Sequence, residues 1–307
     1  MVRSFLRDAD LSREDLSRIL DTTRDLKPRI ENRESLDFLR DRVVVLLFEK
    51  PSTRTRNGFE VAVLRLGGKA VYNASSEMQL TRGEPIRDTA RILGQYYDAI
   101  VARVFAQDTV DQLAEHSGIP VINALSDLNH PTQAVCDLFT VMEVKGTLAG
   151  LTLAYTGDGG NVCHSLLVAC PGAGMNIHVA CPKGHMPRHD IVEEARAIAG
   201  AGGCEVHVIS DPREAARGAD VLYTDVWVSM GQEVDGDRKL KEFEGFQVNE
   251  ELLRLADKDA VVMHCLPAHR GLEITDDVIE GPQSVVWLQG ANKMYAAAGI
   301  LKYFLTL

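Results

Sequence analysis

The sequence predicts an α/β protein of two lobes, each a parallel sheet flanked by helices, with the active site in the cleft between them. Short runs of β-branched and apolar residues alternate with segments in which apolar residues recur at helical spacing. This alternation is typical of parallel strands covered by helices. The chain has 307 residues, which exceeds the roughly 100–200 residues of one ordinary domain, so two cores are expected.

Six apolar runs are predicted to be buried strands because they are short and rich in β-branched residues. They are 43–48, 99–102, 151–155, 177–180, 221–224 and 260–263. Helices are predicted after Ser12 and after Pro131, where apolar side chains share one face, and over 291–307.

The segment 145–150, Lys-Gly-Thr-Leu-Ala-Gly, separates a long helical pattern from a new strand. Glycines between two periodic segments indicate a loop, so we expect the domain junction here. The first domain then covers residues 1–147 and the second 148–290. Composition alone leaves open which lobe carries the helix over 291–307.

Charge and composition exclude several classes of protein. The formal net charge of −11 argues against a surface for nucleic acid or for an anionic membrane, since either would need a basic field. No apolar run approaches the roughly 20 residues of a membrane span, and the first residues lack the apolar stretch of a signal peptide. A cytoplasmic location is therefore expected.

The six cysteines include no C-x-x-C pair and stand in apolar surroundings. Reduced, buried thiols are expected, and neither disulfides nor a zinc finger.

The segment 48–56, Phe-Glu-Lys-Pro-Ser-Thr-Arg-Thr-Arg, leaves a predicted strand and enters an amphipathic helix. Ligands of open parallel sheets bind beyond the carboxyl ends of the strands. At a helix start, free N–H groups, the positive dipole end, hydroxyls and guanidinium groups together favour an anion. Taken alone, the segment is more typical of a Ser52 cap followed by two solvated arginines.

Two further candidates lie at transitions from strand to helix. Arg103 closes the strand 99–102, and residues 130–133, His-Pro-Thr-Gln, open a helix. Arginine at the end of a buried strand suits a second contact to an oxyanion, and His130 with Gln133 can point the same way toward a carbonyl. A single histidine before proline is otherwise a cap or a surface residue.

The segment 155–162 follows a strand and precedes a helix, as the dinucleotide fingerprint G-x-G-x-x-G does. The pattern fails at Val162, and no acidic residue follows the strand 177–180 to hold a ribose. We expect no cofactor, and a nicotinamide oxidoreductase is only a distant alternative. Asn161, at the helix start, instead suits the carboxylate of a small ligand.

Two segments follow later strands, 224–233 and 264–271. Asp225 is a candidate for binding an ammonium group. Cys265 is a possible nucleophile, but neighbouring residues of a strand face opposite ways, so His264 is poorly placed to activate it. Cys265 and His269 without a third ligand do not make a metal site, and no metal is expected.

Together these motifs resemble the aspartate/ornithine carbamoyltransferase family over nearly the whole chain, in the same order. Residues 52–56, Ser-Thr-Arg-Thr-Arg, are similar to the family's carbamoyl phosphate motif. His130-Pro-Thr-Gln, Asp225-Val-Trp-Val-Ser-Met-Gly and His264-Cys-Leu-Pro resemble the ornithine branch specifically. The resemblance implies transfer of the carbamoyl group from carbamoyl phosphate to the side-chain amine of L-ornithine, giving L-citrulline and phosphate.

The resemblance also implies roles for individual residues. Carbamoyl phosphate would contact Ser52, Thr53, Arg54, Thr55, Gln79, Arg103, His130, Pro131, Thr132, Gln133, Cys265, Leu266 and Lys293. Ornithine would contact Asn161, Asp225, Ser229, Met230, Cys265 and Leu266. The residues expected to be catalytic are Arg54, Arg103, His130 and Cys265.

Similar enzymes are homotrimers, so self-association as a trimer or a multiple of trimers is expected, with Gln79 reaching a neighbour's phosphate. The family's last helix returns to the first lobe, which would place 291–307 there. This chain departs from the family at Lys293, Gly160 and Thr81, where Arg, Asn and Gly are usual. A putrescine or acetylated-ornithine carbamoyltransferase, or a catalytically silent carbamoyl phosphate-binding relative, is the alternative.

Overall fold

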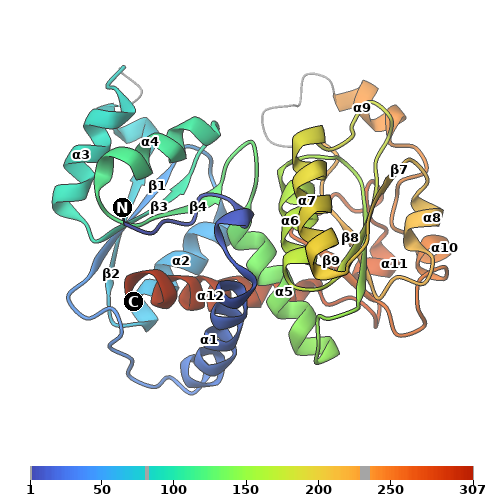
Figure 1. Cartoon of the computed structure of the whole chain (residues 1–307), viewed down its shortest axis with the longest axis horizontal. Helices are drawn as coiled ribbons and strands as arrows, with labels where there is room; N and C mark the ends of the chain where they lie inside the picture. Colours follow the sequence, from blue (N-terminus) through green and yellow to red (C-terminus); the bar gives the residue numbers. More distant parts are fainter. Residues whose placement is uncertain (1, 80–82, 229–235, 307) are drawn as a thin grey trace. The chain divides into compact units, whose positions relative to one another are not determined.

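A computed structural model of the chain describes residues 2–79, 83–228 and 236–306 (Figure 1). The chain forms two compact units. Unit 1 consists of Met1–Phe139 and Ala291–Leu307, and unit 2 of Thr140–Gly290. Within the described ranges, no helix combines the length and the apolar character that crossing a membrane requires.

Unit 1 contains a four-stranded parallel sheet in the order β2-β1-β3-β4. The strands are β1 (Val43–Phe48), β2 (Lys69–Ala74), β3 (Ala99–Arg103) and β4 (Val121–Leu125). The central strands β1 and β3 are almost wholly buried, because apolar side chains of both faces pack against helices.

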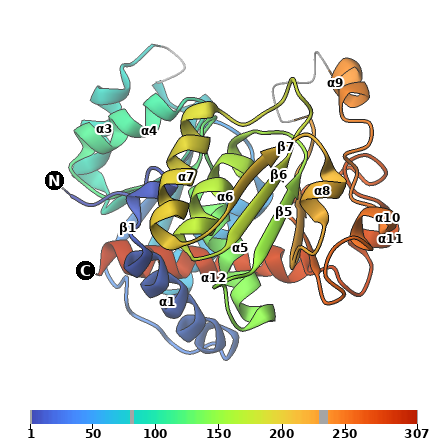
Figure 2. The same ribbon diagram turned by 45° about the vertical axis from the view of Figure 1, so that its right-hand side comes forward.

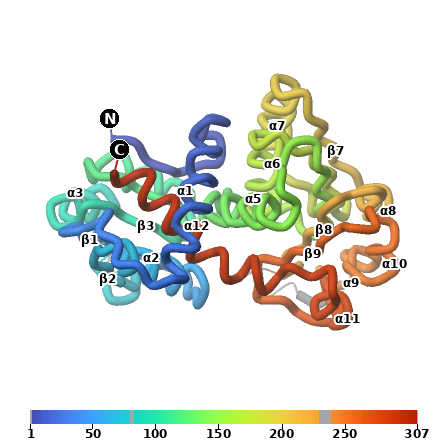
Figure 3. Tube along the Cα trace, turned by 90° about the horizontal axis from the view of Figure 1, so that it is seen from below, coloured from blue at the N-terminus to red at the C-terminus, as the bar shows by residue number. Residues whose placement is uncertain are grey.

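The helical elements of unit 1 are η1 (Asp8–Asp10), α1 (Arg13–Glu31), α2 (Thr53–Arg65), η2 (Ser75–Glu77), α3 (Ile86–Tyr96) and α4 (Gln107–Ser117). The boundaries between the units fall within α5 (Pro131–Lys145) and α12 (Val286–Leu305). Ser12 caps α1 by accepting a hydrogen bond of 3.1 Å from the Asp15 N–H. The unit 1 part of α12 lies against α1, where a Cβ on Gly299 would overlap Thr23 (Figure 3).

Unit 2 contains a five-stranded parallel sheet in the order β7-β6-β5-β8-β9. The strands are β5 (Thr152–Thr156), β6 (Asn176–Ala180), β7 (Val206–Ile209), β8 (Val221–Thr224) and β9 (Val261–His264). The helices are α6 (Asn161–Gly172), α7 (His189–Gly202), α8 (Pro212–Ala216), α9 (Gly236–Glu242), α10 (Glu250–Leu253) and α11 (Asp276–Ile279). Figure 2 shows α6 and α7 on one side of this sheet and α8 on the other.

The predicted α/β class with two parallel sheets is confirmed, and all six predicted strands are present with ends that differ by at most one residue. The three strands that the apolar runs did not predict are β2, β4 and β7. The strands β2 and β7 are partly exposed sheet edges, so their sequences are not continuously apolar, and β4 carries the buried Asn123. The last helix begins earlier than predicted, at Val286.

None of the six cysteines, all within described ranges, forms a disulfide. Four are buried as predicted, whereas Cys204 and Cys265 are partly exposed.

Each sheet has one point where the strand order reverses. In unit 1 the chain goes from β1 to β2 on one side and then to β3 on the other side of β1. In unit 2 it goes from β5 to β6 and β7, and then to β8 on the opposite side of β5. Crevices at the carboxyl ends of such strands are the usual ligand sites of open α/β sheets.

Candidate active site

The start of α2 lies at the reversal point of the unit 1 sheet. The last residue of β1, Phe48, pairs with Arg103, the last residue of β3. Ser52 is the N-cap of α2, and its hydroxyl accepts a hydrogen bond of 3.1 Å from the Thr55 N–H. Thr55 is buried and Arg54 is partly buried in the first turn. The hydroxyls, an arginine and the positive end of a 13-residue helix therefore stand beside Arg103.

Cationic charge is concentrated at these strand ends. Arg103 is only 6% exposed. Lys50, which the sequence did not single out, lies with its Nζ 4.4 Å from the centroid of the Phe105 ring. Burial, and then the neighbouring charge of Arg103, lowers the pKa of Lys50. A charged arginine beside a partly desolvated lysine favours the binding of an anion here.

His130 belongs to a buried polar cluster with Gln133 and Lys293. Lys293 Nζ donates a hydrogen bond to Gln133 Oε1 and lies 3.4 Å from His130 Nε2. Because an ammonium group only donates, Nε2 is the unprotonated nitrogen and Nδ1 carries the hydrogen, 3.5 Å from Thr132 Oγ1. Burial lowers the pKa of His130 well below its usual value, and the charges of Lys293 and Arg103 lower it further. His130 is therefore neutral at pH 7.

The turn before His130 is fixed by side chains at the end of β4. Asn123 Nδ2 donates a hydrogen bond of 2.8 Å to Asn129 Oδ1, and Ser126 N–H donates one of 2.9 Å to the Asn129 carbonyl. Both asparagines are buried. The His130 and Gln133 side chains point the same way, since both contact the Lys293 ammonium group.

In unit 2, the loop after β5 leads to Asn161, the first residue of α6. The Tyr155 hydroxyl donates a hydrogen bond of 2.8 Å to the Asp158 carbonyl, and the Gly159 N–H donates one of 2.9 Å to the His185 carbonyl. A Cβ on Gly159 would lie 2.6 Å from the same His185 oxygen. Gly159 is therefore required because another backbone segment approaches it closely. It does not serve nucleotide binding, as the glycines of the dinucleotide fingerprint do.

An ion network that the sequence did not predict joins this loop to α9. Lys239 Nζ lies 2.8 Å from Asp158 Oδ2, and both side chains are largely buried. His185 lies between Asp158, at 3.4 Å, and Glu242, at 2.6 Å. Asp158 and Lys239 are 81 positions apart in the chain, so no local pattern indicates the network.

Asp225 and Cys265 lie together at the ends of the neighbouring strands β8 and β9. The Cys265 thiol donates a hydrogen bond of 2.9 Å to Asp225 Oδ1, and the Val226 N–H donates one of 2.8 Å to the same oxygen. The Asp225 carboxyl group is thus held at the end of β8, next to the reversal point of the unit 2 sheet.

His264 is engaged by other partners and does not activate Cys265. Its Nδ1 accepts a hydrogen bond of 2.8 Å from the Leu266 N–H, so its Nε2 carries the hydrogen and donates to Glu273 Oε1 at 3.1 Å. His264 and Glu273 are both fully buried. Leu266 has a left-handed backbone, with φ of 58°. Such strain in a residue other than glycine is often found at functional sites and persists only where contacts enforce it.

The structure also brings Asp225, His264 and Cys265 within reach of a common metal ion, with ligand atoms within 4.8 Å of one another. The sequence had not predicted this grouping. Both nitrogens of His264 already have partners, so an ion there would have to break a hydrogen bond to Leu266 or Glu273.

The remaining predicted residues have the following places. Thr53 and Gln79 are exposed, whereas Pro131 and Thr132 are buried at the start of α5. Ser229 and Met230 lie outside the described residues, as does Thr81. At Gly160, the N-cap of α6, an added Cβ would meet only Asp158 Oδ2, at 3.6 Å, so a side chain fits there.

Comparisons with known proteins show the family of the chain. The model for the carbamoyl-P binding domain of aspartate/ornithine carbamoyltransferase matches residues 3–143, and the model for its Asp/Orn binding domain matches 149–304. A Methanosarcina acetivorans protein named ornithine carbamoyltransferase is 46% identical over 301 residues, covering 98% of each chain. One of that name from a Parafrankia species is 49% identical over 304 residues, covering 99% of this chain and 96% of the relative.

A solved structure titled ornithine carbamoyltransferase from Pyrococcus furiosus superimposes with a TM-score of 0.94 at 44% identity, covering 97% of this chain and 96% of that one. The two family models together span nearly the whole sequence, and each of the two relatives spans it alone. The chain therefore belongs to the aspartate/ornithine carbamoyltransferase family.

Proposed function

We propose that the chain transfers the carbamoyl group of carbamoyl phosphate to the side-chain amine of L-ornithine, producing L-citrulline and phosphate. The acceptor is inferred from relatives named ornithine carbamoyltransferase that match nearly the full length. Residues 1–147 with 291–307 form the carbamoyl phosphate-binding domain in this proposal, and residues 148–290 the ornithine-binding domain. The matches to a carbamoyl-P binding domain over residues 3–143 and to an Asp/Orn binding domain over 149–304 support this division.

The observation that best supports binding of carbamoyl phosphate is a neutral histidine close to two buried cationic side chains. His130 has a lowered pKa because burial and the charges of Lys293 and Arg103 all oppose its protonation. The same positive field favours the phosphate dianion. The neutral His130 ring, whose Nδ1 lies 3.5 Å from Thr132 Oγ1, is assigned to the carbamoyl oxygen as a donor that adds no charge.

The phosphate of the donor is assigned to the start of α2. The donors proposed for its oxygens are the hydroxyls of Ser52, Thr53 and Thr55, the Arg54 guanidinium and N–H groups of the first turn. Arg103 completes this set from β3. Gln133 is held by Lys293, and Lys293 supplies a point charge where the family usually has the fork of arginine.

The acceptor half is assigned to the ends of β5, β8 and β9. Asp225 provides a carboxylate for the ammonium group of the amino acid, and Asn161 provides an amide for its carboxylate. Cys265 and the backbone of Leu266 are assigned to the reacting groups. Ser229 and Met230 complete this set in the proposal.

The chemistry requires an amine to attack the carbamoyl carbon, a tetrahedral oxyanion to form and phosphate to leave. An amine with a reference pKa of about 10.4 is mostly protonated at pH 7, and neutralising it costs about 4.6 kcal/mol. Donors such as Arg54, Arg103 and His130 offset the barrier by stabilising the developing charge. Loss of one such donor typically costs about 3–4 kcal/mol.

The proposal extends to assembly and location. A homotrimer or a multiple of trimers is proposed, with Gln79 contributing to a neighbouring subunit's phosphate site, and the location is cytoplasmic. Gln79 is exposed, which is compatible with a contact to another subunit.

The decisive experiment measures citrulline formation from carbamoyl phosphate and ornithine, with putrescine and N-acetylornithine as competing acceptors. Preference for ornithine supports the proposal, and preference for either other amine refutes the acceptor assignment. An Arg54→Ala variant is expected to lose carbamoyl phosphate binding, measured by calorimetry, while it keeps the circular dichroism spectrum of the parent. An Arg87→Ala variant, changed on the partly exposed first turn of α3, is the control.

A further inference from the structure

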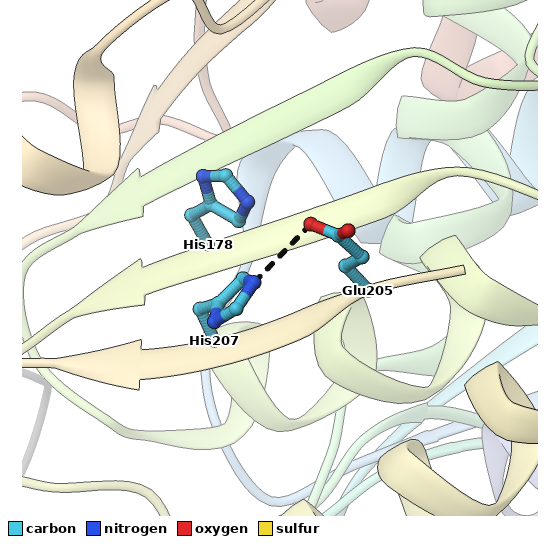
Figure 4. Close-up of side chains that lie close together, drawn as sticks. All are labelled: His178, Glu205 and His207. Carbon is cyan, nitrogen blue, oxygen red and sulfur yellow. Dashed lines mark hydrogen bonds and ion pairs between the residues drawn. The ribbon is translucent and has the colours of Figure 1, made fainter.

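Three side chains with metal-ligating atoms lie together on the edge of the unit 2 sheet (Figure 4). His178 is in the middle of β6, and His207 is its register partner on the edge strand β7. Glu205 precedes His207 by two positions, so both side chains point to the same face of the strand. Parallel pairing thus places two imidazoles and a carboxylate side by side.

His178 brings a buried ring nitrogen to this group. Its Nε2 is buried and has no hydrogen-bond partner among the residues that the structure describes. A buried polar atom without a partner costs free energy, and a metal ion bound at Nε2 would offset that cost.

The distances suit a small divalent ion. His207 Nε2 lies 3.2 Å from Glu205 Oε2, and the ligand atoms of all three residues lie within 4.8 Å of one another. Two ligands of a tetrahedral zinc ion, each about 2.0–2.1 Å from the metal, are roughly 3.3 Å apart. The Glu205 and His207 side chains are 69% and 54% exposed, so they are able to turn by the small amount that closes the set around an ion.

We propose that His178, Glu205 and His207 form a binding site for a divalent first-row transition metal ion, with Zn²⁺ as its test ion. Two imidazoles and one carboxylate are ligands that Zn²⁺, Co²⁺ and Ni²⁺ accept, whereas Mg²⁺ and Ca²⁺ prefer oxygen ligands. Water completes the coordination. The bound ion ties β7, the edge strand that pairs with β6, to the body of the sheet.

This site is separate from the candidate active site. Asp225 and Cys265 lie at the ends of β8 and β9, on the other side of β5 from β6 and β7. The inference does not rest on the proposed carbamoyl transfer, and the two stand or fall independently. The Cys265 group also contains possible ligands, so the experiment must distinguish a thiolate site from this one.

The test is titration of the metal-stripped full chain with Zn²⁺ by calorimetry and with Co²⁺ by absorption spectroscopy. We expect one Co²⁺ per chain with visible d–d bands and no thiolate-to-cobalt charge-transfer band. His207→Gln and Glu205→Gln should each weaken binding by at least the roughly 10- to 100-fold that loss of an outer-sphere partner costs. Both residues are largely exposed, so these variants are expected to keep the fold.

His189→Gln is the matched control, because His189 is an exposed histidine with a single carboxylate, Glu193, 4.0 Å away. It should bind both ions as the parent does. The proposal is overturned if the parent shows no saturable binding, if His207→Gln and His189→Gln bind equally, or if the cobalt spectrum contains a thiolate band that disappears in Cys265→Ser.

Discussion

The substitution Gly159→Ala tests whether the loop after β5 positions Asn161 for the acceptor. A Cβ on Gly159 would lie 2.5 Å from the Met186 carbonyl carbon and 2.6 Å from the His185 oxygen. Carbon atoms in ordinary contact are about 3.5 Å apart, so the loop and the 185–187 backbone must separate by roughly 1 Å. The substitution therefore displaces the start of α6.

The expected loss of activity and of stability follows from that displacement. A misplacement of about 1 Å in a positioning element costs on the order of 10²-fold in rate, equivalent to about 2.7 kcal/mol. Overpacking of this kind also lowers the free energy of unfolding by about 1–3 kcal/mol. We expect kcat/KM for ornithine to fall by roughly 10- to 100-fold, while the Kd for carbamoyl phosphate, assigned to unit 1, stays unchanged.

The neighbouring Gly160→Ala is the control, because its Cβ would meet only Asp158 Oδ2, at 3.6 Å. It should cost no more than about 1 kcal/mol in stability, since alanine is a poorer N-cap than glycine. The assays are steady-state kinetics with varied ornithine, calorimetry with carbamoyl phosphate and urea denaturation. If Gly159→Ala and Gly160→Ala give the same kcat/KM and the same denaturation midpoint, the loop does not position the acceptor as argued.

Three further predictions concern single side chains. Asp225→Asn should reduce kcat/KM for ornithine by about 30-fold or more, because loss of one partner of a desolvated charge pair costs about 2–5 kcal/mol. An unchanged kcat/KM in steady-state kinetics would remove Asp225 from the acceptor site. Glu273→Leu leaves the buried His264 Nε2–H without its acceptor and should lower the free energy of unfolding by about 1–3 kcal/mol. Urea denaturation measures this change, and a denaturation midpoint equal to the parent's would contradict the hydrogen bond between His264 and Glu273. The pKa of His130 is lowered in the folded chain. Below a pH of about 6.5, the unfolded chain therefore takes up a proton at this histidine that the folded chain does not. The free energy of unfolding should fall as the pH drops, by up to about 1.4 kcal/mol per pH unit. The difference in unfolding free energy between parent and His130→Gln, measured from pH 7.5 to 5, should show this slope, and a pH-independent difference would exclude it.

The sequence predicted those parts of the fold that local patterns encode. Continuous apolar runs marked β1 and β3 because both faces of a central strand are covered. Ser12 marked the start of α1 because a hydroxyl cap satisfies a free N–H. The edge strands β2 and β7 were not predicted, since their half-exposed sequences lack a continuous apolar run.

The candidate site was predictable where chemistry follows directly from a position at a strand end. Arg103 and Asp225 were identified because they come directly after buried strands. The contact between Asp158 and Lys239 was not predicted, because the two residues are distant in sequence. The hydrogen bonds of both His264 nitrogens were not predicted either, because they depend on the direction of the ring. The left-handed backbone of Leu266 likewise has no local marker, as leucine rarely adopts it.

The repeated reversal of strand order has a practical consequence for engineering. In the proposed assignment, the side chains that contact ligands follow the strands of each sheet, whereas the apolar strand interiors maintain the scaffold. Replacing residues 225–228, the described residues that follow β8, is therefore a rational route to a different amine specificity that preserves the residues assigned to the phosphate of the donor.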